Sequence, residues 1–209
     1  MKLNDRDLIR KEPSSVIVNH WVLAISCILL TISGFGFLYK LEWVGMLFGG
    51  FNAMKVVHNW LGVIFTISLI VTLPTWLKEC STYDKDDLAW IMAAGGYLSH
   101  KVAIPPMHKL NTGQKLAYLG VLGMGVGVAA SGFAIWLLPA SKTLLLWSHF
   151  LHNVCFVGIG IFIPIHVYLG AIANPGTMRI MISGTVPVWW ARKKSPKWIQ
   201  EVEEGRSSH

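Results

Sequence analysis

The chain has 209 residues, of which 53% are hydrophobic and only 14% are charged. Soluble domains carry roughly 25% charged residues, so this composition indicates a protein that resides in a lipid bilayer. The formal charge of +7 does not indicate nucleic-acid binding, because membrane proteins collect Lys and Arg on their cytoplasmic loops. The three cysteines lie within or just after apolar stretches, so no disulfide framework is expected.

Four apolar stretches follow one another along the chain, each near the 20 or so residues needed to cross about 30 Å of hydrocarbon. We expect spans at residues 16–38, 56–77, 116–138 and 144–173, followed by a tail at 174–209. No small-residue cleavage site follows the first stretch, which we interpret as a span rather than a signal peptide. The sequence therefore predicts an all-α fold, an integral membrane four-helix bundle forming one domain over residues 1–209.

The distribution of cations predicts the orientation of these spans. The N-terminal segment holds four Lys or Arg, the middle loop five and the tail six, whereas the two remaining loops hold only Lys40, Lys55 and Lys142. Because cytoplasmic loops are enriched in Lys and Arg, both termini and the middle loop are expected in the cytoplasm.

Two extramembrane segments are expected at the membrane surface. Within the middle loop, YDKDDLAWIMAAGGYLSH has too few apolar residues to span and predicts an interfacial helix. In the tail, VPVWWARKKSPKW mixes Trp with cations, a composition typical of an anchor on anionic headgroups.

These spans contain five histidines, although their interiors hold almost no carboxylate or cation. An ionisable side chain within a bilayer is costly and is by default a functional candidate. Proton relays usually also need embedded Asp or Glu, so neutral imidazoles that ligate an apolar cofactor fit better. The candidates are His20, His58, His149, His152 and His166.

Their depths predict two pairs. His20 lies near the cytoplasmic start of the first span and His166 near the cytoplasmic end of the fourth, so we name them the inner pair. His58 and His152 lie near the opposite ends of the second and fourth spans and form the outer pair. Two haems, one at each level, would let electrons cross the membrane.

The fourth span carries one ligand of each predicted pair. Fourteen residues at about 100° each leave His152 and His166 roughly 40° apart on one helix face, separated by roughly 21 Å along the axis. His149 is the alternative outer ligand, but it points about 100° away from His166 by the same arithmetic. We therefore favour His152.

Glycine is dense in the third span, where close helix packing is the preferred interpretation. Glycines near the histidines are expected to make room for a flat macrocycle beside its ligands. They are Gly34, Gly36, Gly62, Gly158 and Gly160.

Several motifs together resemble the cytochrome b, or gamma, subunits of membrane-bound bacterial formate dehydrogenases. They are the NHW of Asn19–Trp21, HNWLG from His58, HKLNTGQK from His108 to Lys115, the spacing of His152 and His166, and the closing GTMRIMISGTVPVWWARKKSPKW. The resemblance covers nearly the whole chain.

This resemblance implies a quinone-reducing subunit with two haem b groups, the inner held by His20 and His166 and the outer by His58 and His152. It also implies a menaquinone near the inner haem, contacted by Asn111 and Gly113, with Gln114 adjacent. An alternative interpretation of NTGQK is a helix N-terminus capped by Asn111 or Thr112, and the two interpretations are compatible.

The partners implied by the resemblance are an iron-sulfur beta subunit and a molybdenum or tungsten alpha subunit, where formate oxidation itself would lie. The expected location is the bacterial inner membrane, with a higher oligomer of the heterotrimer possible. Two alternatives stay open: the same module serving a hydrogenase or thiosulfate reductase, and a small transporter or anchor whose histidines bind substrate, protons or metal.

Overall fold

The computed structural model describes residues 3–96, 103–138 and 141–205. Four of its helices are long and apolar enough to cross a membrane: Ser14–Leu38, Phe51–Thr75, Thr112–Leu137 and Lys142–Ala173. These helices begin two to five residues before the spans predicted from the sequence. The prediction of an all-α membrane bundle is therefore confirmed, and the chain is a multi-pass membrane protein.

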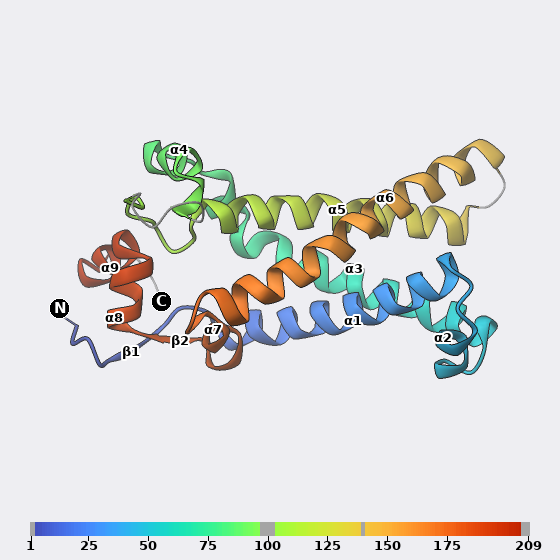
Figure 1. Cartoon of the computed structure of the whole chain (residues 1–209), viewed down its shortest axis with the longest axis horizontal. Helices are drawn as coiled ribbons and strands as arrows, with labels where there is room; N and C mark the ends of the chain where they lie inside the picture. The colour runs from blue at the N-terminus through green and yellow to red at the C-terminus, as the bar shows by residue number, and fades with distance from the viewer. Residues whose placement is uncertain (1–2, 97–102, 139–140, 206–209) are drawn as a thin grey trace. The chain divides into compact units, whose positions relative to one another are not determined.

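The elements run in the order shown in Figure 1. The long helices are α1 (Ser14–Leu38), α3 (Phe51–Ser81), α5 (Thr112–Leu137) and α6 (Lys142–Val167), the last continuing into the π-helical turn η2 (Tyr168–Ala173). The short elements are β1 (Leu8–Arg10), α2 (Glu42–Leu47), α4 (Lys85–Met92), η1 (Ala94–Gly96), α7 (Thr177–Ser183), β2 (Thr185–Pro187), α8 (Val188–Lys194) and α9 (Pro196–Glu203).

The chain divides into two compact units. We call residues 18–73 and 121–168 the helical unit, and residues 1–17, 74–120 and 169–209 the cap unit. The helical unit contains most of the four long helices together with α2, and the cap unit contains the remaining short elements.

The four long helices of the helical unit form a closed ring of neighbours. Asn19 of α1 hydrogen-bonds to Ser68 of α3. A Cβ added at Gly125 of α5 would press on Leu69 of α3. A Cβ added at Gly127 of α5 would press on Cys155 of α6. Phe35 of α1 packs edge-on against Phe156 of α6, 4.9 Å between ring centres. These glycines confirm close helix packing in the third span.

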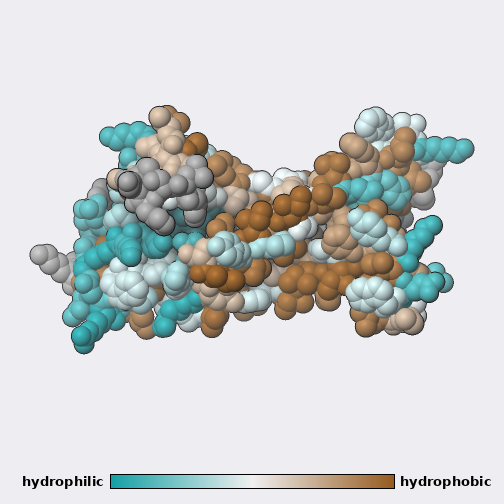
Figure 2. Space-filling view, in the orientation of Figure 1, coloured by the Kyte–Doolittle hydropathy of each residue, from teal (hydrophilic) through white to brown (hydrophobic). Residues whose placement is uncertain are grey.

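The outward face of the long helices is apolar. Side chains such as Ile25, Ile64, Val126 and Ile161 are between 45% and 61% exposed, and Figure 2 shows hydrophobic colour along these helices. Exposed aliphatic surface of this extent is suited to lipid rather than water.

The cap unit has its own small core, built where the two chain ends meet. Strands β1 and β2 pair antiparallel, with Ile9 opposite Val186. Gly184 ends α7 with φ +71°, and an added Cβ would clash with the carbonyl oxygen of Glu12, so only glycine fits there. The core gathers Ile9, Ile180, Val186, Val188, Trp190, Ala191, Trp198 and Ile199.

This core corrects one sequence prediction. Trp190 and Trp198 were expected to lie at the membrane surface with their neighbouring cations, but they are only 6% and 4% exposed. Trp189, in contrast, is 53% exposed. The two indoles lie in one core with apolar residues of the tail and with Ile9 of β1, which comes from the other end of the chain.

The short helix α4 occupies the middle loop, where an interfacial helix was predicted. Asp84 caps it: its carboxylate accepts from the amides of Asp86 and Asp87, and the Asp87 carboxylate accepts from the Asp84 amide in return. Its exposed apolar side chains include Leu88, at 61%, and Met92, at 81%. Residues 97–100 of the predicted segment lie outside the described residues.

Candidate functional site

The helical unit brings the predicted histidines together in two pairs. The ring centres of His20 in α1 and His166 in α6 are 6.2 Å apart, with 44° between the ring planes. Those of His58 in α3 and His152 in α6 are 6.4 Å apart, with 58° between the planes. These are the pairs that the sequence predicted from depth.

The ring separations match what one iron between two imidazoles requires. A metal–imidazole bond is about 2 Å long and the ring centre lies about 1 Å beyond the nitrogen, so two axial ligands have centres roughly 6 Å apart. Without a metal, imidazoles that hydrogen-bond directly or stack would lie closer. Both pairs therefore fit a bis-histidine haem.

Contacts at His152 determine which of its nitrogens is free. Its Nδ1 lies 3.0 Å from the carbonyl oxygen of Val128 and 3.1 Å from the Ser131 hydroxyl, both in α5. Because a carbonyl oxygen can only accept, Nδ1 must carry the proton and donate it. The lone pair on Nε2 is then available to a metal.

His58 has an equivalent contact on the other side of the outer pair. Its Nδ1 lies 2.7 Å from the hydroxyl oxygen of Ser33 in α1. The Ser33 hydroxyl itself donates to the Leu29 carbonyl at 2.8 Å, so its oxygen is free to accept from His58. Nε2 is thus unprotonated in His152, and it is unprotonated in His58 when Nδ1 of that ring donates to Ser33.

The inner pair is held differently. Nδ1 of His20 is buried and has no hydrogen-bond partner among the described residues. His166 stacks on Phe162, 5.3 Å between ring centres. An orphaned buried nitrogen is uncommon in proteins, and this one distinguishes the inner pair from the outer pair.

Neighbouring residues distinguish His152 from its rival. His149 is exposed and makes no ring contact with any of the four paired histidines. Gly132 of α5 lies directly against His152, since an added Cβ would approach Cε1 of the imidazole to 3.2 Å.

The glycines near the histidines fall into two groups. A Cβ at Gly62, one turn after His58, or at Gly160 would meet nothing within 4 Å, which leaves room for a flat ligand. At Gly34, Gly36 and Gly158 a Cβ would press on protein side chains. The first group fits the predicted role, and the second serves helix packing.

The predicted quinone residues lie in the cap unit, at the start of α5. Asn111 and Gln114 form a reciprocal capping box: the Asn111 side-chain oxygen accepts from the Gln114 amide at 2.8 Å, and that of Gln114 accepts from the Asn111 amide at 2.9 Å. Asn111, and not Thr112, is therefore the cap. Gly113 lies between Asn111 and Gln114 in the sequence and packs against Trp90, because a Cβ added at Gly113 would approach the Trp90 ring to 2.6 Å.

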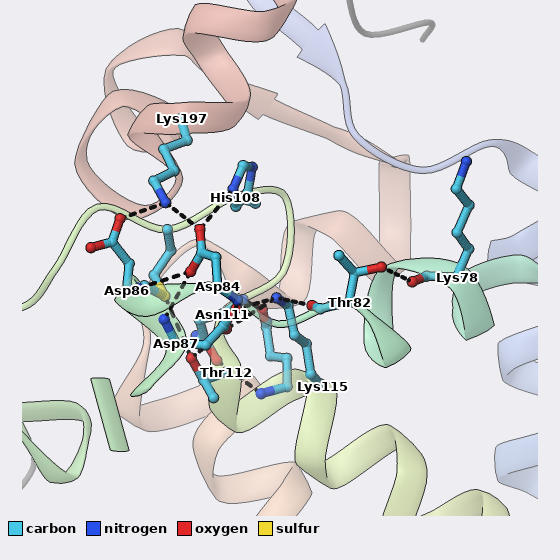
Figure 3. Close-up of polar contacts among 12 residues, drawn as sticks. Lys78, Thr82, Asp84, Asp86, Asp87, His108, Asn111, Thr112, Lys115 and Lys197 are labelled. Atoms are coloured by element: carbon cyan, nitrogen blue, oxygen red, sulfur yellow. Dashed lines mark hydrogen bonds and ion pairs between the residues drawn. The ribbon is translucent and has the colours of Figure 1, made fainter. Parts of the chain in front are cut away.

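Buried charges hold this helix start in place (Figure 3). Lys115 and Asp87 are 5% and 3% exposed and lie 2.8 Å apart. Asp87 also accepts from the Thr112 hydroxyl at 2.7 Å, and Lys115 donates to the Thr82 carbonyl at 2.9 Å. Burial raises the pKa of Asp87, but its bonds to Lys115, the Asp84 amide and Thr112 outweigh that and leave the pKa below its usual range.

A second layer of ions surrounds the first. Lys197 of α9 lies 2.7 Å from Asp84 and 2.5 Å from Asp86, and its hydrogen bond holds the pKa of Asp84 well below its usual range. Nδ1 of His108 lies 2.8 Å from the carboxylate of Glu201. Asp84, His108 and Glu201 line a polar cavity of about 530 Å³ that Lys115 and Asp87 also border.

The profile of the prokaryotic cytochrome b561 family matches residues 13–184, most of the chain. The chain belongs to this family. Haem b binding follows from membership, and the two imidazole pairs are the groups that fit it. The resemblance predicted from the motifs is confirmed at this level.

Relatives of this cytochrome carry a more specific name. The cytochrome b556(fdo) subunit of formate dehydrogenase from Escherichia coli strain K12 is 27% identical over 204 residues, 95% of each chain. The nitrate-inducible cytochrome b556(Fdn) subunit from the same strain is 26% identical over 90% of this chain and 88% of its own. The Haemophilus influenzae formate dehydrogenase cytochrome b556 subunit is 24% identical over 95% of this chain and 84% of its own.

Reasoning from sequence missed two residues of the site, Ser33 and Ser131. Small hydroxyl residues are frequent in membrane helices, where they bond to their own helix. Nothing in their spacing separates these two from Ser26, which, unlike them, bonds only within its own helix, at 2.8 Å to the Val22 carbonyl. Only the packing of α1 on α3 and of α5 on α6 reveals their contact with histidine.

Proposed function

We propose that this chain is the di-haem cytochrome b subunit of a formate dehydrogenase, and that it carries electrons across the membrane to reduce menaquinone. The observation that carries the proposal is the pair of imidazole couples, 6.2 and 6.4 Å between ring centres. Similarity to three formate dehydrogenase subunits over at least 90% of this chain supports the choice of enzyme.

His20 and His166 would hold the inner haem, and His58 and His152 the outer one. Bound haem supplies reversible one-electron carriage. Because His152 and His166 are separated by roughly 21 Å of helix axis, each pair occupies its own level of the bilayer. The protein's contribution is to fix the rings and to exclude water from them.

Menaquinone would bind at the start of α5 in the cap unit. Its reduction to the quinol takes two electrons and two protons, and its carbonyl oxygens need hydrogen-bond donors. The oxygens of Asn111 and Gln114 are used in the cap, so their amide NH₂ groups and the first-turn backbone amides, including that of Gly113, remain as donors. The charged cavity beside Lys115 would admit the water that supplies protons.

The proposed setting is the bacterial inner membrane with both termini cytoplasmic, following the cation distribution. An iron-sulfur subunit on the outer side would deliver electrons to the outer haem. A molybdenum or tungsten subunit beyond it would oxidise formate. Co-purification of these subunits with the tagged chain tests this assembly. Co-purification of hydrogenase or thiosulfate reductase subunits instead would assign the chain to that enzyme.

The decisive experiment is a haem count. Dithionite-reduced minus oxidised spectra of the purified complex should show a b-type alpha band corresponding to two haems per chain. His166→Ala should remove about half of this band and abolish quinone reduction. His149→Ala is the matched control on the same helix and should keep both haems.

One haem or none in the unmodified protein would contradict the proposal. The same holds if His166→Ala leaves the band at full strength.

A further inference from the structure

The two imidazole pairs differ in what their Nδ1 atoms contact. In the outer pair, His58 faces the Ser33 hydroxyl at 2.7 Å, and His152 faces the Val128 carbonyl at 3.0 Å and the Ser131 hydroxyl at 3.1 Å. In the inner pair, the buried Nδ1 of His20 has no hydrogen-bond partner among the described residues, and His166, which is exposed, makes ring contacts with His20 and Phe162. The difference lies entirely within the helical unit.

An acceptor at Nδ1 changes the electronics of a ligand bound through Nε2. A hydrogen bond donated by Nδ1 increases the negative charge on the ring and makes it a stronger donor to the metal. Stronger donation stabilises the oxidised form of the iron more than the reduced form. The midpoint potential of that haem therefore falls.

We propose that Ser33 and Ser131, together with the Val128 carbonyl, lower the potential of the outer haem below that of the inner one. This rests on the proposed function, because it requires one haem at each pair. Single electrons then pass downhill from the outer to the inner level, one centre being oxidised as the other is reduced, with no bond made or broken. Ser33 and Ser131 are positioning residues, since they act through the histidines.

The two hydroxyls are built as acceptors. Ser33 and Ser131 are 0% and 3% exposed, so water does not compete for them. Each donates its own hydrogen to a carbonyl one turn earlier in its helix, Leu29 at 2.8 Å and Gly127 at 2.6 Å. Their oxygens consequently face the imidazoles with lone pairs, in surroundings where a hydrogen bond is electrostatically strong.

The geometry also predicts a graded response. Ser33 is the single acceptor for His58, so Ser33→Ala leaves that Nδ1 without a partner. Ser131→Ala still leaves the Val128 carbonyl for His152. Ser26→Ala is the matched control: Ser26 lies on α1, is 2% exposed and bonds only to Val22 and Leu23 of its own helix.

The test is a potentiometric titration of the haem alpha band in the intact complex. The unmodified protein should show two components. Ser33→Ala should raise only the lower component, by a threefold to tenfold change in its reduction equilibrium, or about 30–60 mV at 59 mV per tenfold for one electron. Ser131→Ala should raise the same component by less, and Ser26→Ala should move neither.

A haem count on each variant separates the two proposals. If the unmodified protein holds fewer than two haems, the proposed function fails. If two haems are retained and Ser33→Ala moves neither component, or raises only the higher one, the proposed function stands and this inference is overturned. If Ser33→Ala loses the outer haem, Ser131→Ala decides, because an unshifted lower component there overturns the inference as well.

Discussion

The helical unit and the cap unit position their functional side chains by different physical means. In the helical unit the outer imidazoles are held by hydroxyls and a backbone carbonyl, all of them neutral. In the cap unit the start of α5 is held by the buried pair of Lys115 and Asp87. The first arrangement involves no formal charge, and the second depends on it.

The contrast follows from the surroundings of each unit. A charge in hydrocarbon is costly, so a membrane helix orients a ligand with groups that have already satisfied themselves on their own helix. At the membrane boundary, water and opposite charges are available, and an ion pair can fix a loop more strongly than a neutral bond. Breaking the charged contacts should therefore cost more stability than breaking the neutral ones.

Asp87→Asn should show the largest effect. It removes the negative charge that pairs with Lys115, so the buried ammonium keeps only neutral oxygen partners, the Thr82 carbonyl and the amide oxygen of the substituted side chain. Removing one member of a buried pair typically costs about 3–5 kcal/mol. Thermal unfolding in detergent, followed by tryptophan fluorescence, should show this loss of stability. Below the unfolding temperature of the variant, the haem band should persist.

Asp86→Asn is the control for that experiment. Asp86 pairs with Lys197, but both side chains are about one-fifth exposed, and Lys197 keeps Asp84. A change of about 0–1 kcal/mol is expected. Equal losses for the two variants would contradict the distinction between buried and surface charge in the cap unit.

Lys11 should give the cap unit an alkaline dependence of stability. Lys11 is 6% exposed, and burial lowers its pKa from 10.5 to about 8. Between these values the unfolded chain holds a proton that the folded chain has lost, so stability rises with pH through this window, by roughly 3 kcal/mol at 1.36 kcal/mol per unit.

Replacing Lys11 with Met should remove this dependence. Lys11→Met should be the more stable protein at pH 7, with the advantage shrinking towards pH 10.5. The substitution also removes the contacts of the Lys11 ammonium with the rings of Trp190 and Trp198, at 5.2 and 5.5 Å from the ring centres. Unfolding curves measured from pH 7 to 10.5 that stay parallel for the two proteins would rule out a deprotonated Lys11.

Asn19→Ala should show a smaller effect than Asp87→Asn or the substitution of Lys11, although it removes more than one hydrogen bond. Asn19 donates to the Ser68 carbonyl and to the Thr72 hydroxyl, and accepts from the Ser68 hydroxyl at 2.8 Å. Hydrogen bonds between membrane helices average about 0.6 kcal/mol and reach about 1.7 kcal/mol. Unfolding in detergent should show a loss near this range, and a loss as large as that of Asp87→Asn would erase the contrast between the units.

The sequence predicts the bundle and the histidine pairs for clear physical reasons. A span has to be long and apolar, so four such stretches are visible without any knowledge of packing. Helix periodicity places His152 and His166 on one face, and alternating direction sorts four histidines by depth. The capping role of Asn111 is also local, because a cap and its partner Gln114 are three residues apart.

What only the tertiary structure decided involves residues distant in sequence. Ser33 meets His58 and Ser131 meets His152 only after α1 packs on α3 and α5 on α6. Trp190 and Trp198 become members of a core in which residues of the tail gather with Ile9 of β1, from the other end of the chain. Composition and helical periodicity show how each segment partitions between lipid and water. The contacts between distant residues depend on which helix faces pack together. That is why the sequence alone predicted the paired histidines, and packing alone decided which atoms contact their Nδ1 nitrogens.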